Sequence, residues 1–179
     1  SADDLMLRQR NLILDSHKDI TTTEYLINQY KLEEDWIEGE QYTFVIKGTV
    51  ASGQTFGIWM NGASNRVGSL TEIYSTGIYY GTFTAVAPTS ELNKRTVNLY
   101  NTPNNTTSAT VDWVALYKGN KPFDWTPALG DAMLYRAWSN KEDGSVDFTR
   151  TYPNPNLFDI TRPEVRNPAT TKAEFLNNP

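Results

Sequence analysis

The chain has 179 residues, of which 39% are hydrophobic and 21% charged, and this composition suits one well-cored globular domain with an appendage. Its formal net charge of −5, without a visible cluster of lysines and arginines, argues against a nucleic-acid partner, and no apolar run is long enough to span a membrane. The absence of cysteine excludes disulfides, thiolate metal sites and cysteine nucleophiles.

Alternating apolar and polar residues between turn clusters predict a series of short β-strands. Residues 1–10 form a lead-in arm, and residues 20–37 favour strand over the alternative, a short amphipathic helix that Thr23 would cap. The expected strands cover residues 11–15, part of 20–37, 42–47, 55–60, 68–74, 77–86, 95–101 and 108–117. Their length and regular spacing predict an antiparallel β-sandwich.

After Pro127 the regular series of strands and turns ends and prolines become frequent, so residues 131–179 are expected to be a linker or extension. Long regular elements are excluded there by prolines at positions 153, 155, 163, 168 and 179. The stretch Asn156-Leu157-Phe158-Asp159 echoes residues 11–15, which is consistent with the first strand of a further domain.

The most specific stretch is Val111-Asp112-Trp113-Val114-Ala115-Leu116-Tyr117-Lys118-Gly119, followed by Phe123-Asp124-Trp125-Thr126-Pro127-Ala128. A strand that is stopped at Gly119 and Pro122 and then held to the body by Trp125 is the expected structure. The stretch resembles the closing signature of carbohydrate-binding-module-like jelly rolls in bacteriophage tail and baseplate proteins. Residues 10–16 and 38–44 resemble the first and third strands of these domains, so the resemblance covers about residues 8–130.

The resemblance implies an all-β, antiparallel jelly-roll sandwich over residues 11–130 that binds glycans on a sheet face or in edge loops. It also implies a non-enzymatic module that attaches a virion to cell-wall polysaccharide of its host. Such a protein is made in the host cytoplasm, assembles with other tail subunits as a homo-oligomer in the virion, and acts at the host cell surface. Two rival functions are a structural or oligomerisation module of a phage tail, and a binding appendage of a secreted polysaccharide hydrolase.

Four of the expected strands place large aromatic residues in the phase that faces away from the inter-sheet core. A row of such rings among amides suits saccharide binding, because the C–H face of a sugar packs on an aromatic ring. The predicted binding residues are Trp59, Tyr80, Asn98, Tyr100, Trp113 and Tyr117, with Gln54, Asn101 and Asp112 as further polar groups. Packing is the alternative for Trp59 and Tyr100 and the favoured role of Trp113, while Trp36 and Trp125 are expected to be structural.

Catalysis has little support in the sequence. The single histidine, His17, has no nucleophile motif nearby, and no spacing singles out a pair of acidic residues. No cofactor is expected, apart from a structural calcium ion of the kind that related modules often bind. Asp15 and Asp112, on the expected first and last strands, are the candidate ligands for this ion.

Overall fold

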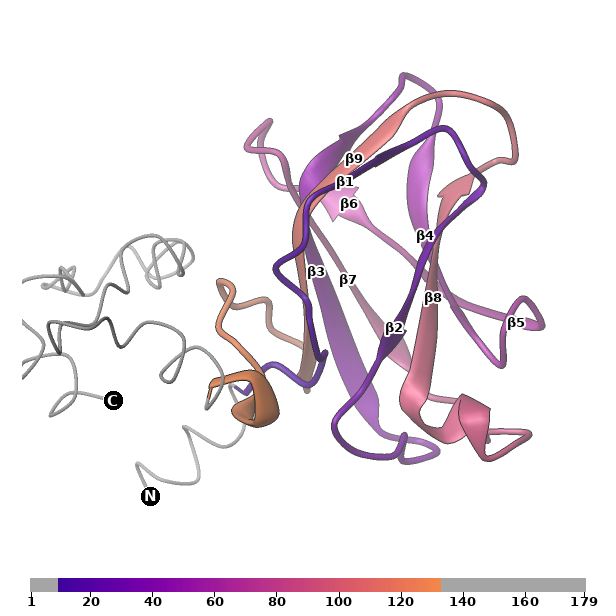
Figure 1. Cartoon of the computed structure of the whole chain (residues 1–179), viewed down its shortest axis with the longest axis vertical. Helices are drawn as coiled ribbons and strands as arrows, with labels where there is room; N and C mark the ends of the chain where they lie inside the picture. The colour runs from indigo at the N-terminus through magenta and orange to yellow at the C-terminus, as the bar shows by residue number, and fades with distance from the viewer. Residues whose placement is uncertain (1–9, 133–179) are drawn as a thin grey trace, which may run out of the picture.

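The computed structural model describes residues 10–132, which form two antiparallel β-sheets packed face to face (Figure 1). One sheet has the order β1-β9-β3-β7-β6 and the other the order β2-β8-β4-β5. The expected arm at 1–10 and extension at 131–179 lie almost entirely outside the described residues. In chain order the elements are β1 (Ile20–Thr22), β2 (Leu26–Lys31), β3 (Gln41–Val50), β4 (Thr55–Met60), β5 (Asn65–Ser69), β6 (Thr71–Glu72), β7 (Ile78–Thr84), the 3-10 turn η1 (Leu92–Arg95), β8 (Thr96–Thr102) and β9 (Ala109–Lys118).

The strand pairs are nested, as if one long hairpin had been folded over to form the two sheets. β1 pairs with β9, β2 with β8, β3 with β7, and β4 with β5, all antiparallel. The outer pairs fall alternately in the two sheets, which is the arrangement of a jelly roll. The predicted fold class, an antiparallel jelly-roll β-sandwich, is therefore confirmed.

The core between the sheets follows the predicted alternation. The inward-facing side chains include Phe44, Phe56, Ile58, Met60, Val97, Leu99, Val114 and Leu116. A β-bulge opposite Lys47 and Gly48 makes Asp112 an extra residue in β9, so Val111 still faces the core. Glycine is required at the bulge, because a Cβ at Gly48 would lie 2.1 Å from the carbonyl oxygen of Thr110.

Two expected strands differ from the structure. Residues 11–15 form a single bridge, Ile13 to Leu32, because their hydrogen bonds go to both sheets. The Leu12 N–H donates to the Leu116 carbonyl at 2.9 Å, and the Leu14 N–H donates to the Lys31 carbonyl at 2.9 Å. This segment therefore closes the edge between β9 and β2.

The expected strand at 68–74 is divided between the two sheets. β5 lies in the four-stranded sheet and β6 in the five-stranded sheet, with Leu70 buried at the crossing. Residues 20–37 likewise contribute β1 and β2 to different sheets, so the helix alternative is wrong. Both cases follow from a jelly-roll chain that changes sheet within a few residues.

The outer face of the five-stranded sheet is covered by residues 119–128, the orange segment beside β3 and β9 in Figure 1. Trp125 packs there in a second apolar cluster, and its Nε1–H donates to Ser16 Oγ at 2.8 Å. Trp36 is also buried, and its Nε1–H donates to the Thr96 carbonyl at 2.9 Å. Both tryptophans are structural, as predicted.

The two ends of the described part meet at one side chain, Glu33. Its Oε1 lies 3.0 Å from Nε of Arg10, and its Oε2 accepts from the backbone N–H of Gly130 at 3.2 Å. Nearby, the backbone N–H of Asp15 donates to a carboxylate oxygen of Asp131 at 2.6 Å. These contacts hold the beginning and the end of the described part side by side.

Candidate functional site

The structure divides the six predicted binding residues between the two sheets. Trp59, Asn98 and Tyr100 belong to the outward phase of β4 and β8, in the four-stranded sheet. Tyr80, Trp113 and Tyr117 belong to the outward phase of β7 and β9, in the five-stranded sheet. Strand alternation therefore gave the outward phase of these residues, but not the sheet to which each strand belongs.

Trp113 and Tyr117 serve as packing residues. They are 2% and 0% exposed, because residues 119–128 cover them, and both belong to the cluster around Trp125. The Tyr117 hydroxyl donates to the backbone carbonyl of Asp124, and burial raises the pKa of Tyr117. Tyr80 is 36% exposed on the same sheet, so it does not share a surface with Trp59.

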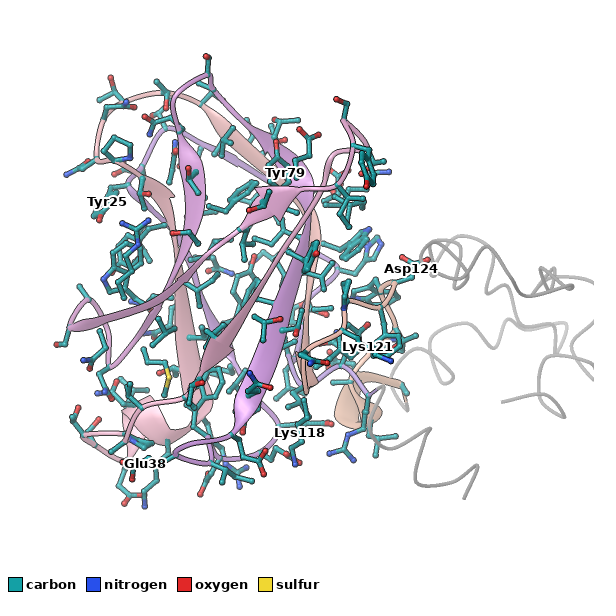
Figure 2. All side chains as sticks on the ribbon, turned by 180° about the vertical axis from the view of Figure 1, so that it is seen from behind. Tyr25, Glu38, Tyr79, Lys118, Lys121 and Asp124 are labelled. Atoms are coloured by element: carbon teal, nitrogen blue, oxygen red, sulfur yellow. The ribbon has the colours of Figure 1, made fainter. Side chains whose placement is uncertain are left out.

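The outer face of the four-stranded sheet carries a row of three aromatic rings, which we call the ring row: Trp59, Tyr100 and Tyr25. The Trp59 and Tyr100 centroids are 4.9 Å apart with an interplanar angle of 66°, and those of Tyr25 and Tyr100 are 4.6 Å apart. Tyr100 is only 6% exposed because it lies between the other two rings. Figure 2 shows Tyr25 on the side of the sandwich opposite Asp124 and Lys121.

Trp59 is half-buried because its indole folds back over its own strand. A Cβ at Gly57 would lie 2.4 Å from Cζ3 of Trp59 and 2.8 Å from Cγ2 of Thr102, so only glycine leaves room for the ring. On the neighbouring strand β5, Arg66 is paired with Trp59, and its guanidinium carbon lies 5.2 Å from the indole centroid. The indole is thus positioned by residues of three adjacent strands.

Polar groups flank the ring row. Gln29 Nε2 donates to Asn98 Oδ1 at 2.9 Å, and Asn98 Nδ2 donates to the Tyr100 hydroxyl at 3.2 Å. The strand registers place Gln29, Asn98, Trp59 and Arg66 in one line across β2, β8, β4 and β5. Asn98 is buried and orients its neighbours, whereas the exposed Gln29 keeps its Oε1 free of other hydrogen bonds within residues 10–132.

Two further predicted polar residues hold a loop instead of lining the ring row. Gln54 Nε2 donates to Asn101 Oδ1 at 2.9 Å and to the Pro103 carbonyl at 2.7 Å. Its Oε1 accepts from Asn105 Nδ2 at 2.7 Å. Gln54 and Asn101 therefore fix the turn after β8. Asp112 is exposed at the β9 bulge, on the other sheet.

The structure offers little that could hold a metal. Within residues 10–132, no three histidine, aspartate or glutamate side chains come together as a metal site would require. Asp15 and Asp112 are both exposed, and the calcium ion predicted between them remains a prediction. His17 packs edge-on against Trp125 with ring centroids 4.6 Å apart, and burial lowers the pKa of His17 against the opposing effects of its own backbone and of Asp19 and Asp112.

Sequence reasoning missed three residues of this face: Tyr25, Gln29 and Arg66. Tyr25 precedes β2, and a bulge in β2 breaks the alternation that would have marked Gln29. Arg66 lies in β5, where Asn65, Arg66 and Ser69 leave no apolar periodicity to read. Cross-strand pairing with Trp59 is what brings Arg66 to the site, and pairing is not visible in one sequence.

Comparison of the chain with protein-family models and with curated proteins gives no match. Among the described helical turns, none is long and apolar enough to cross a bilayer. What can be said of function therefore depends on the geometry of the ring row and on the resemblance of the closing stretch.

Proposed function

We propose that the chain is a non-enzymatic carbohydrate-binding module that takes glycans on the outer face of its four-stranded sheet. The observation that carries the proposal is the ring row, in which a half-buried Trp59 is held in place by Gly57 and Tyr100 beside the exposed amide of Gln29. The opposite sheet cannot offer such a surface along β9, because residues 119–128 cover it.

The chemistry of the ring row fits a sugar. The C–H face of a pyranose packs on an indole, and sugar hydroxyls need amide partners such as Gln29 Oε1. Tyr100 and Asn98 are buried, so the groups that would contact the ligand rest on rigid neighbours. Such preorganisation lowers the entropy lost on binding.

The resemblance of residues 111–128 supports the biological setting. In this proposal the module belongs to a phage tail or baseplate protein, is made in the host cytoplasm, and attaches the virion to cell-wall polysaccharide at the host surface. One shallow site of this kind would bind weakly, with a dissociation constant of roughly millimolar to micromolar. Several copies in a homo-oligomeric tail would supply the avidity that attachment needs.

The test is glycan binding by the full chain and by two alanine variants. Trp59→Ala should weaken binding to the best ligand of a polysaccharide array about tenfold, because the stacking surface is lost. Tyr80→Ala is the matched control, since it removes an exposed ring from the other sheet. Unchanged affinity in Trp59→Ala, with a normal melting temperature, would refute the site.

A structural or oligomerisation module is the second candidate. Leu26, in register with Tyr100 at the ring row, is 42% exposed, and an apolar side chain at that place would suit contact with a protein. Light scattering distinguishes the two functions. A stable oligomer that Leu26→Ser dissociates, together with no glycan binding, would favour assembly over attachment.

A further inference from the structure

The four-stranded sheet differs in charge from the rest of the chain. Its strands β2, β4, β5 and β8 contain no aspartate or glutamate, and their only charged residues are Lys31 and Arg66. Both residues are exposed. The whole chain, in contrast to these strands, is acidic, with a net charge of −5. The strands behind the ring row therefore carry two basic residues and no acidic one, in a protein that is acidic as a whole.

Arg66 is the arginine in residues 10–132 that pairs with no carboxylate. Arg10 lies 3.0 Å from Glu33 and 2.8 Å from Glu34, and Arg95 lies 2.6 Å from Asp35. Arg66 instead donates to Ser69 Oγ at 2.6 Å and lies over the Trp59 ring. Its positive charge therefore has no carboxylate partner in this part of the chain, and it lies beside the ring on which the proposed function places the sugar.

We infer that the ring row takes an acidic saccharide, whose anionic group pairs with Arg66 while the sugar packs on Trp59. The inference rests on the proposed function and adds the class of glycan to it. The planar guanidinium fits a carboxylate or phosphate through two parallel hydrogen bonds, and an exposed cation–π contact is weak enough to rearrange.

The second basic residue indicates the length of the ligand. Lys31 lies on edge strand β2 and Arg66 on edge strand β5, so three strand spacings, roughly 14 Å, separate the two strands. Arg66 is in line with Gln29, and Lys31 lies two residues further along β2. An oligosaccharide that crosses the strands would reach both residues, and a monosaccharide would not. A chain with repeated anionic groups therefore suits the face better than one with a single charged end.

The experiment starts from the full chain on an array of neutral, carboxylated and phosphodiester-linked polysaccharides. The best ligand is then titrated against Arg66→Gln and against Arg95→Gln, which makes the same charge change at an exposed arginine paired with Asp35. Arg66→Gln should weaken binding about tenfold, as expected for a charge-assisted pair, and Arg95→Gln should leave the affinity unchanged. Lys31→Gln should cause a smaller loss.

The ligand itself provides a second control. Reduction of its carboxylates to alcohols, or removal of its phosphates, should abolish most of the binding, and the group whose loss has this effect identifies the anion. A neutral best ligand, or full affinity in Arg66→Gln, would overturn the inference. If Trp59→Ala still weakened binding in that case, the proposed function would stand. If no polysaccharide bound at all, the proposed function would fail with it.

Discussion

Replacing Asn11 with aspartate should make the stability of the domain depend on pH. The Asn11 side chain is fully buried and uses its whole hydrogen-bonding capacity. Its Nδ2 donates to Ser16 Oγ at 3.0 Å and to the Thr126 carbonyl at 2.8 Å. Its Oδ1 accepts from the backbone N–H groups of Ile13 and Leu116, each at 3.0 Å. One amide thus joins the first segment, β9 and the closing segment.

Aspartate would keep both accepted hydrogen bonds but lose both donors. An ionised carboxylate would then face the Thr126 carbonyl without a proton between them, and burial would raise the pKa of the new group above the ordinary value of about 3.9. Since the folded pKa exceeds the unfolded one, the protonated form stabilises the fold. That contribution is complete below the unfolded pKa and is lost as the pH rises through the folded pKa.

The expected loss follows from these contacts. One buried carbonyl left unsatisfied costs about 1–3 kcal/mol, and a buried charge adds to this, so Asn11→Asp should cost about 3–4 kcal/mol at neutral pH. Near pH 4 the protonated acid can donate one hydrogen bond, and the cost should fall to about 1 kcal/mol. The loss is therefore smaller in acid than at neutrality.

Urea unfolding followed by tryptophan fluorescence between pH 4 and pH 8 measures this difference against the unchanged protein. Asn104→Asp, in the exposed turn after β8, makes the same chemical change without burial and should show no such trend. A difference in unfolding free energy that stays constant with pH, or remains below about 1 kcal/mol throughout, would refute the role given to Asn11.

Two further predictions concern backbone packing and alkaline stability. Gly48→Ala should lower the free energy of unfolding by more than about 3 kcal/mol in thermal denaturation, because the new Cβ would meet the Thr110 carbonyl. The control Gly68→Ala, whose Cβ would contact Phe83 at 3.4 Å, should cost less than about 1 kcal/mol. Equal losses in the two variants would contradict this prediction. Burial raises the pKa of Tyr30 to about 12, above its ordinary value of 10.0, so the stability due to its protonated phenol is complete below pH 10 and is lost as the pH rises toward 12. Tyr30→Phe should remove about 1.3 kcal/mol of this alkaline loss between pH 9 and pH 11, measured by urea unfolding at the two pH values. An unchanged slope would show that Tyr30 does not cause the loss.

The sequence correctly predicted which side chains face the core where this depends only on the alternation within one strand. Phe56, Ile58 and Met60 face the core and Trp59 faces outward, as the period of two predicts. The same rule predicts the outward phase of Trp113, but the burial of Trp113 depends on residues 119–128, which follow β9 and fold back over it. Local patterns do not contain that return.

The candidate site was predicted in part for the same reason. The sequence predicted that the rings of Trp59 and Tyr100 both face outward, but not that they touch. The 4.9 Å between their centroids depends on β4 lying beside β8. Arg66 reaches Trp59 through a register shift between β4 and β5, which no single-strand pattern records. Partners in a jelly roll are set by nesting of distant strands, so the polar half of the site emerges only with the fold.

The meeting of both described ends at Glu33 has a mechanical consequence. Tension applied between residues 10 and 132 would load the short path from Arg10 through Glu33 to Gly130 before it reached the hydrogen-bond ladders of the sheets. The force would then pass through these contacts at Glu33, and the two sheets would lie outside its path.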